Sequence, residues 1–518
     1  MVETTNSSSE QFQEAYQLTQ KPPGSRKWWV MLAMGMGMFI YALDVYIITI
    51  ALPILGQSLH ASFATLQWVV LSYLLMLTTL VLGAARLGDM WSKKWLYFGG
   101  VILFTISSLL CGLAPNVGFL IGFRTLQGLG AVFIAAMAPA IITEVFPEKQ
   151  RGQALGILWA IFTVGIAMGP GAGGLLIALG SWRLIFLVNV PIGLVACLLV
   201  VLVVPSSVRS DVKQRFDLIG ALLMILTLSS FALATSQIQS ESFSSTTKLA
   251  LLGLAAIGLV SFLLVEARQP QPMLELGIFR NIELSLGSLL GLLVFMVIVA
   301  ADLILPFFLE LVKHYPPGEA GLLLMVFPIL DAAIAPVAGI LSDRLQPRIV
   351  SFMGLLLLLL GCWGISTFDT DLTVVGYIVR IAPFGLGLGM FLTPNSSAIM
   401  GAVPQERLGI ASGLVSLSRT LGLTTGLSVL GTLFSILTIS STKLVSNLEL
   451  PATRVTPVID VINAPVESLV FGVQTTFRVA TVILIAATIL AAFLWWLEQR
   501  QEKNSARLVP SQLENLSE

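Results

Sequence analysis

The chain has 518 residues, of which 56% are hydrophobic and only 11% are charged. A soluble globular domain carries about 25% charged residues, so this composition excludes an ordinary water-soluble enzyme. The 28 Lys and Arg residues balance the 28 Asp and Glu residues, which leaves no net positive charge for binding nucleic acid. The three cysteines and two histidines show no ligand spacing, so we predict no disulfide framework, no metal site and no cofactor.

Long apolar runs recur along the chain. A helix needs about 20 apolar residues to cross about 30 Å of hydrocarbon, and these runs lack the alternation of a membrane β-strand. We therefore predict an all-α polytopic membrane protein with 14 transmembrane helices. The first six are Trp28–Leu55, Gln67–Leu87, Trp95–Leu113, Val117–Phe146, Ala154–Leu179 and Arg183–Val204. The remaining eight are Phe216–Ile238, Lys248–Glu266, Ile282–Val312, Gly318–Leu341, Ile349–Phe368, Leu372–Ala402, Gly409–Leu437 and Thr476–Leu497.

Basic residues are distributed unevenly between the two predicted sides of the membrane. With the N-terminus placed inside, 19 of the 28 Lys and Arg residues fall in the tails and inner loops, and six fall in the outer loops and their edges. This excess predicts that both termini are cytoplasmic and that the protein crosses the cytoplasmic membrane. The remaining three, Arg124, Arg380 and Arg419, lie within predicted helices.

The two ends of the chain repeat the same features at an offset of about 255 residues. Asp44 in the first predicted helix is matched by Asp302 in the ninth, and Arg124 is matched by Arg380. These matches predict two six-helix bundles, at 28–208 and 271–498, joined by two linker helices at 209–270. We predict an outer loop at 440–474 and disordered cytosolic tails at 1–27 and 499–518. Paired six-helix halves around a midplane site are a transporter architecture.

Five segments share their spacing with motifs of one known family. They are Leu43-Asp44 with Ala51-Leu52-Pro53, the loop Ala85–Lys94, Arg124-x-x-Gln127-Gly128, Gly165-x-x-x-Gly169-Pro170-x-x-Gly173-Gly174, and Trp182-Arg183 with Asn189-x-Pro191. Together they resemble the major facilitator superfamily, in its fourteen-helix drug:proton antiporter branch, over about residues 28–437. The loop departs from the family pattern at Ala85, Met90 and Ser92.

The resemblance implies that the chain is not an enzyme but a proton-coupled efflux transporter of hydrophobic, cationic drugs or toxic compounds. Its partners would be that small substrate, protons and the lipid bilayer, with no nucleic acid and no obligatory protein partner. No GxxxxGK[ST] motif for ATP phosphates occurs in the chain, which favours an ion gradient as the energy source.

The glycine-rich segment has two interpretations. Gly165, Gly169 and Gly173 repeat every four residues and would present a bare helix face to a neighbouring helix. Gly174 extends this segment, and Pro170 would add a kink. The string Gly169-Pro-Gly171-Ala-Gly173-Gly174 also fits the GxGxxG pattern of dinucleotide sites, but no soluble βαβ unit surrounds it. We therefore predict a helix-packing segment, which the resemblance identifies as the antiporter motif.

Clustered charges follow two equivalent helices. Asp89, Lys93 and Lys94 follow the second predicted helix, and Asp343 and Arg344 follow the tenth. One interpretation is solvated charge that orients the chain in the membrane. The resemblance implies instead a conformational latch that holds the two halves in one state of alternating access.

Three predicted helices carry an acidic residue at similar depth. Helical rise puts Asp44, Asp302 and Asp331 roughly 15–20 Å below the outer face. An ionisable side chain at such a depth usually faces a partner or a water-filled cavity. We predict that these acids, with Arg124 and Arg380, form one shared site for protons and substrate.

Other roles for these side chains remain open. Burial disfavours the charge of the Asp44 carboxylate while a nearby Arg124 favours it, so Asp44 is expected to exchange a proton near neutral pH. The alternatives are a static Asp44–Arg124 pair, and polar helix packing for Asp302 and Asp331. Arg419 is a further candidate for the site.

Three other functions fit parts of the sequence. A transporter of the same fold could carry one lipid, siderophore or metabolite. A transport-inactive membrane sensor is disfavoured because the intramembrane carboxylates are present. A membrane enzyme is disfavoured because no His, Cys or metal-ligand spacing accompanies those carboxylates.

Overall fold

The computed structural model describes residues 26–205, 217–236, 245–269, 277, 280–401, 408–449 and 461–514. Every regular element within those ranges is a helix. In this described part, 13 helices are long and apolar enough to cross a membrane, and a fourteenth apolar helix, Leu218–Ala234, is shorter. The prediction of an all-α polytopic membrane protein with 14 such helices is confirmed.

The first helices form an N-terminal set. They are α2 (Arg26–Leu59), α3 (Phe63–Met90), α4 (Lys93–Gly112), α5 (Val117–Val145), α6 (Glu148–Ala178), α7 (Leu184–Leu187) and α8 (Asn189–Val203). Polar caps fix two of the starts, because the side chains of Ser62 and Asn116 accept hydrogen bonds from the backbone of Thr65 and Phe119. Pro191 lies in the first turn of α8, where a missing backbone N–H leaves no helical bond unmade.

The remaining helices form a linker pair and a C-terminal set. The linker pair is α9 (Leu218–Ser236) and α10 (Ser245–Glu266). The C-terminal set is α11 (Ile282–Phe307) with its π-helical continuation η2 (Phe308–Val312), α12 (Pro317–Leu324), α13 (Val326–Arg344), α14 (Pro347–Ile365), α15 (Val374–Gly401), α16 (Leu408–Glu449), the 3₁₀ turn η4 (Val461–Asn463) and α17 (Val466–Glu514).

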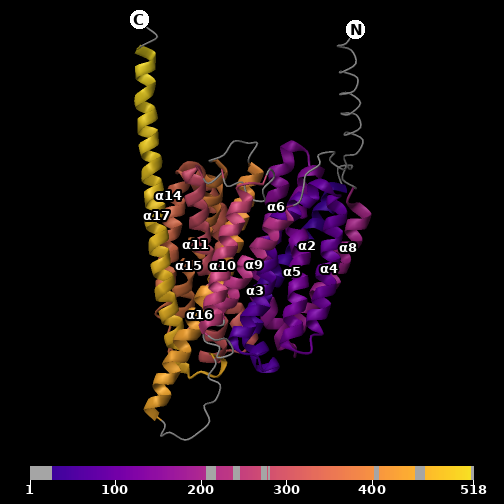
Figure 1. The fold of residues 1–518 in the computed structure, drawn as a ribbon, viewed down its shortest axis with the longest axis vertical. Helices are drawn as coiled ribbons and strands as arrows, with labels where there is room; N and C mark the ends of the chain where they lie inside the picture. The colour runs from indigo at the N-terminus through magenta and orange to yellow at the C-terminus, as the bar shows by residue number, and fades with distance from the viewer. Residues whose placement is uncertain are drawn as a thin grey trace.

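The two sets pack by the same scheme. In the N-terminal set, α2 packs against α6, α5 packs against α3 and α4, and α8 packs against α2 and α4. In the C-terminal set, α11 packs against α16, α15 packs against α13 and α14, and α17 packs against α11 and α14. The linker helices α9 and α10 pack against each other, and α9 also contacts α3 and α16, beside the junction of the two sets (Figure 1).

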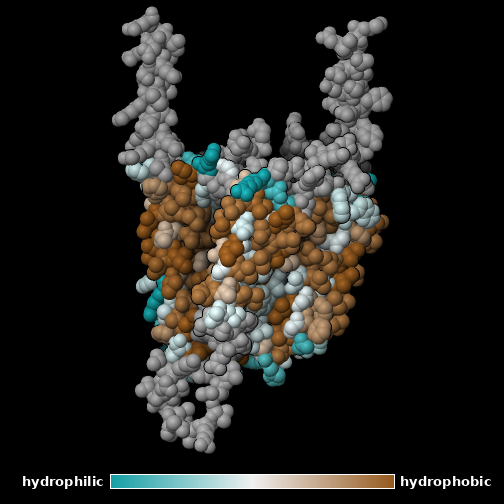
Figure 2. All heavy atoms as spheres, viewed as in Figure 1, coloured by the Kyte–Doolittle hydropathy of each residue, from teal (hydrophilic) through white to brown (hydrophobic). Residues whose placement is uncertain are grey.

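The outside of the molecule is apolar around its middle. A broad hydrophobic band covers the visible face, with polar residues gathered toward both ends (Figure 2). Leu249, Ile257 and Ile489 are more than 60% exposed, which a water-soluble protein would avoid on such a scale. The band is suited to hydrocarbon, so the chain is a multi-pass membrane protein.

The two sets meet closely at one end. We call the end that holds the start of α2 and the end of α17 the terminal end, and the end that holds the turn between α2 and α3 the distal end (Figure 1). At the distal end, the Phe63 ring packs edge-on against Phe307 of α11 and Phe434 of α16, with centroids 5.1 and 5.6 Å away. These contacts join both sets across their junction.

Candidate functional site

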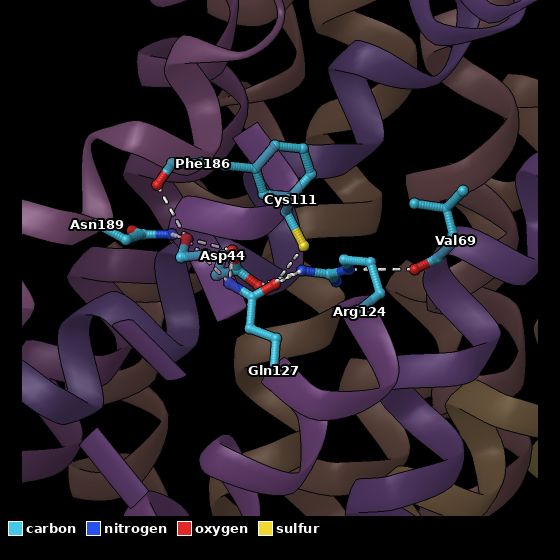
Figure 3. Close-up of polar contacts among 8 residues, drawn as sticks. Asp44, Val69, Cys111, Arg124, Gln127, Phe186 and Asn189 are labelled. Atoms are coloured by element: carbon cyan, nitrogen blue, oxygen red, sulfur yellow. Dashed lines mark hydrogen bonds and ion pairs between the residues drawn. The ribbon is translucent and has the colours of Figure 1, made fainter. Parts of the chain in front are cut away.

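Asp44 lies at the centre of a buried polar network within the N-terminal set. Its carboxylate forms an ion pair with Arg124, and both side chains are completely buried. The other carboxylate oxygen accepts hydrogen bonds from Gln127 Nε2 at 2.8 Å and from Asn189 Nδ2 at 3.0 Å (Figure 3). Residues of α2, α5 and α8 therefore hold one carboxylate together.

A second layer of hydrogen bonds orients the Gln127 and Asn189 amides that donate to Asp44. The Ser108 hydroxyl on α4 accepts from Gln127 and from Asn189, each at 3.1 Å. It donates its own proton to the Phe186 carbonyl at 2.9 Å (Figure 3). Cys111, one turn further along α4, donates its thiol to Gln127 Oε1 at 3.7 Å. This second layer orients the amides toward Asp44.

The Arg124 side chain is enclosed on all sides. Its Nε donates to the Val69 carbonyl of α3 at 3.1 Å, and its guanidinium carbon lies 4.4 Å from the Tyr73 ring centroid. Its second terminal nitrogen is buried without a hydrogen-bond partner among the described residues. Removing the Asp44 charge would leave this buried cation uncompensated, which is costly in an apolar interior. A proton on Asp44 would therefore have to be accompanied by a rearrangement of Arg124.

A second charged cluster lies between the two sets, around Arg419 of α16. The guanidinium carbon of Arg419 lies 4.8 Å from the ring centroid of Phe162 on α6 and 5.6 Å from that of Phe295 on α11. The same guanidinium interacts electrostatically with Asp302 of α11 and Asp331 of α13. Within the described part of the chain, however, no carboxylate lies within 4 Å of it, since the ion pairs found there involve other residues.

Two tyrosines connect this cluster to α2. The Tyr46 phenol interacts electrostatically with both Arg419 and Asp302. Tyr41 interacts with Arg419 and packs against the Phe162 ring, with centroids 5.3 Å apart. Because Tyr46 follows Asp44 by two residues on α2, a shift of this helix would affect both charged clusters.

The structure thus divides the predicted site residues into two groups. Asp44 pairs with Arg124, whereas Asp302 and Asp331 are grouped around Arg419. Arg380 joins neither group, because its guanidinium donates to the Thr367 carbonyl at 2.9 Å, just beyond the end of α14. The one shared site expected from the sequence therefore does not hold all five residues in this conformation.

The contacts of matched glycines explain why Arg380 does not repeat Arg124. A Cβ on Gly128 would meet Tyr73 of α3, and one on Gly385 would meet Phe327 of α13, which occupies the equivalent place. These two glycines are 257 residues apart, so the counterpart of Arg124 on α15 is Ile381. Arg380 is one residue away from it, and one residue is a rotation of about 100° around a helix.

The register of α11 also differs from the one expected. A Cβ on Gly165 would lie 2.8 Å from the Phe39 carbonyl oxygen of α2, and one on Gly422 would lie 2.5 Å from the Leu292 carbonyl oxygen of α11. Phe39 and Leu292 therefore stand in equivalent places, 253 residues apart. In this register Asp302 is the counterpart of Thr49, more than one turn beyond Asp44.

The glycine-rich segment of α6 faces α2 with one side. Added Cβ atoms would lie 2.8 Å from Phe39 O at Gly165, 2.7 Å from Tyr46 Cβ at Gly169, and 2.6 Å from Ile50 Cγ2 at Gly173. Such distances are too short for any side chain, so these glycines let α2 and α6 approach closely.

The opposite side of the same segment faces the C-terminal set. A Cβ on Gly174 would lie 2.2 Å from the Pro317 carbonyl oxygen of α12, and one on Gly321 would lie 2.4 Å from the Pro170 carbonyl oxygen. The backbones of α6 and α12 therefore touch near the distal end. In this structure the segment brings the two sets together as well as packing α6 against α2.

The predicted latch residues are only partly described. The side chains of Asp89 and Asp343 lie outside the described residues. Lys93 forms an ion pair with Glu144 at the end of α5, and Arg344 is exposed. Lys94 donates to the Val204 carbonyl at 2.6 Å, where it satisfies an orphan carbonyl at the end of α8.

Several polar residues of these clusters were not predicted to belong to a site. Gln127 and Asn189 lay within motifs but had no assigned role, and Ser108 and Tyr46 were not singled out. Glu310, at the end of the predicted ninth helix, was also missed, and its Oε1 is buried without a hydrogen-bond partner among the described residues. The sequence signal that could have identified them is a polar residue inside an otherwise apolar helix. No group of three His, Cys, Asp or Glu side chains suited to a metal occurs in the described residues.

Sequence comparison identifies the family. A sequence model described as Major Facilitator Superfamily matches residues 34–427. The chain belongs to the Major Facilitator Superfamily. Its members are transporters and not enzymes, so this chain is a membrane transporter of small substrates.

Related superfamily members differ in what they are named for. Multidrug resistance protein Stp of Mycobacterium tuberculosis is 34% identical over 78% of this chain and 75% of its own length. Riboflavin transporter RibZ of Clostridioides difficile is 31% identical over 79% of this chain and 89% of its own. The crystal structure of a bacterial homolog of the human lysosomal transporter Spinster has a TM-score of 0.67 at 17% identity, covering 91% of this chain and 98% of that one. The last likeness supports the fold alone.

Proposed function

We propose that the chain is a proton-coupled antiporter that exports hydrophobic, cationic compounds across the cytoplasmic membrane. The observation that carries this proposal is the cluster between the two sets, where the Arg419 guanidinium lies over two phenylalanine rings and interacts electrostatically with two carboxylates. A hydrophobic cation needs a carboxylate for its charge and ring faces for its apolar body. The similarity to a protein named for multidrug resistance supports the same class of substrate.

The exchange of a proton for a cation would take place at Asp302 and Asp331. Asp302 is 8% exposed and Asp331 is half-buried, so both are more accessible than Asp44, which is fully buried. Each carboxylate can hold a proton or face a cation, but not both at once. Asp44 and Arg124 would couple this exchange to the position of α2, through Tyr46.

The two helix sets would be the moving parts. We propose that the bundles at 28–208 and 271–498 rock against each other, with 209–270 attached beside them. The distal contacts between α6 and α12 then belong to a state closed at that end. If the terminal end is cytoplasmic, as the basic residues predict, that state is closed to the outside.

An efflux assay on everted vesicles tests the proposal. We expect a proton gradient to drive accumulation of ethidium, and a protonophore to abolish it. The variant Asp302→Asn with Asp331→Asn should lose this transport, whereas the matched variant Glu319→Gln, at an exposed acid of α12, should retain it. Ethidium accumulation that ignores the gradient would overturn the proposal.

A single-substrate carrier is the second candidate. It is favoured by the similarity to a protein named riboflavin transporter, which this chain matches over 89% of that protein's length. In the same vesicles, transport of riboflavin with no transport of ethidium would support this function and overturn multidrug efflux.

A further inference from the structure

Arg419 and Phe162 are counterparts in the two halves of the chain. The separation of 257 residues between Gly165 and Gly422, and between Gly169 and Gly426, also separates Phe162 from Arg419. These two side chains nevertheless touch, with the guanidinium carbon 4.8 Å from the ring centroid. Counterparts related by a pseudo-twofold axis can touch only beside that axis, so Arg419 lies at the centre of the protein, between the sets.

Among the described residues, the Arg419 guanidinium contacts aromatic rings but forms no ion pair. It lies over the rings of Phe162 and Phe295 and interacts electrostatically with the Tyr46 phenol. Asp302 and Asp331 act on it electrostatically, but neither forms an ion pair within 4 Å among the described residues. The buried Arg124, by contrast, is clamped by Asp44. Arg419 can therefore swing aside without breaking an ion pair.

These contacts are the same ones that a hydrophobic cation would use. A planar cation binds aromatic faces through the ring quadrupole and is balanced by nearby carboxylates. Arg419 already provides a planar cation over the rings of Phe162 and Phe295, and it interacts electrostatically with Asp302 and Asp331. A cationic substrate would have to share or displace this resident charge.

We propose that Arg419 is a tethered cation that competes with cationic substrates and sets the charge selectivity of the central site. This inference rests on the proposed function. With both carboxylates ionised, one resident guanidinium leaves a single negative charge, which balances one monocation. A dication would leave the site with a surplus positive charge, so Arg419 selects monocations over dications.

The proposal makes a quantitative prediction, because Coulomb repulsion is proportional to ligand charge. Replacing Arg419 by Gln removes a like charge, and we expect monocation binding to tighten about ten-fold and dication binding about a hundred-fold, the square of that factor. A neutral ligand with the same rings should change less than about two-fold, since it feels no net repulsion.

Fluorescence titration of the purified full chain tests this with three probes that share a ring system. These are ethidium as the monocation, propidium as the dication and dihydroethidium as the neutral compound. Arg419→Gln and Arg419→Met should both give the graded tightening, and Arg419→Lys, which keeps the charge, should not. Two neutral variants are used so that a folding defect in one does not decide the outcome.

Three binding results would contradict the role of Arg419. Equal effects on ethidium and propidium, or weaker binding of the cations in both neutral variants, would overturn the tethered-cation proposal. Loss of dihydroethidium binding in those variants would also overturn it, because Arg419 would then contact the ligand directly. If neither the wild type nor any variant binds any of the three probes, the proposed efflux function itself fails.

Discussion

The Asp44 carboxylate and the Arg124 guanidinium form an ion pair that is completely enclosed by the N-terminal set. Every donor around this carboxylate belongs to α5 or α8, and no residue of the C-terminal set is among its hydrogen-bond partners in the described chain. The pair is therefore a property of one bundle. In the proposed mechanism, its effect on transport passes through the position of α2.

Breaking the pair from one side should destabilise the protein. Asp44→Asn leaves Arg124 buried without a counter-charge, and we expect a loss of about 3–5 kcal/mol in the free energy of unfolding. Arg124→Gln should cost a similar amount. The double variant, Asp44→Asn with Arg124→Gln, should recover most of it, as measured by denaturant unfolding in detergent micelles.

Transport by the double variant separates coupling from structure. We expect it to fold but to lack proton-driven efflux, because no ion pair remains at positions 44 and 124 to couple the exchange at Asp302 and Asp331 to the position of α2. Wild-type efflux rates in this variant would mean that Asp44 and Arg124 are a static structural pair.

The close approach of α2 and α6 should be sensitive to a single methyl group. Gly169→Ala places a Cβ 2.7 Å from Tyr46 Cβ, so we expect a loss of about 1–3 kcal/mol in stability and slower ethidium transport. Gly156→Ala is a matched control on the same helix, because nothing lies within 4 Å of its added Cβ. Equal transport rates in the two variants would contradict the importance of this contact.

The sequence was sufficient for the helices and for the Asp44–Arg124 partnership. Apolar length predicts the spans, and two opposite charges in neighbouring spans of one half favour each other in hydrocarbon. The sequence matches of Asp302 to Asp44 and of Arg380 to Arg124 do not correspond to equivalent positions in space. Arg380 is offset by one residue and Asp302 by five, and such an offset turns a side chain to another face of its helix. The contacts of the matched glycines, Gly128 with Gly385 for α15 and Gly165 with Gly422 for α11, reveal the register.

The Arg419 cluster could not be assembled from the sequence. Its members come from α2, α6, α11, α13 and α16, and no local spacing connects them. Asp302 and Asp331 were recognised because a carboxylate in an apolar run is conspicuous. Phe162 and Phe295 were not recognised, because phenylalanine is common in membrane helices and the sequence does not show that a guanidinium packs on these two rings.

Closure of the distal end should depend on Gly174. An added Cβ there would lie 2.2 Å from the Pro317 carbonyl oxygen, so Gly174→Ala should keep α6 away from α12 and disfavour the distal-closed state. Spin labels at the exposed positions His60 and Glu319 should then report a longer mean distance than in wild type. An unchanged distance distribution would show that the α6–α12 contact does not control closure.

The Lys93–Glu144 pair tests the latch interpretation. Both side chains are partly exposed, so breaking the pair with Lys93→Glu should change stability by less than about 1 kcal/mol. If the pair belongs to a latch, turnover should still fall, and the swap Lys93→Glu with Glu144→Lys should restore it. Unchanged turnover in a well-folded Lys93→Glu protein would favour the other interpretation, in which these charges only orient the chain in the membrane.

The most direct test of the central claim is proton release on substrate binding. Purified protein in weakly buffered detergent solution is mixed with ethidium, and released protons are measured with a pH-sensitive dye. Competition at Asp302 and Asp331 predicts that wild type releases protons and that Asp302→Asn with Asp331→Asn releases none, while Glu319→Gln matches wild type. Ethidium binding without proton release in wild type, or undiminished release in the double variant, would contradict the exchange of protons for cations at these two carboxylates.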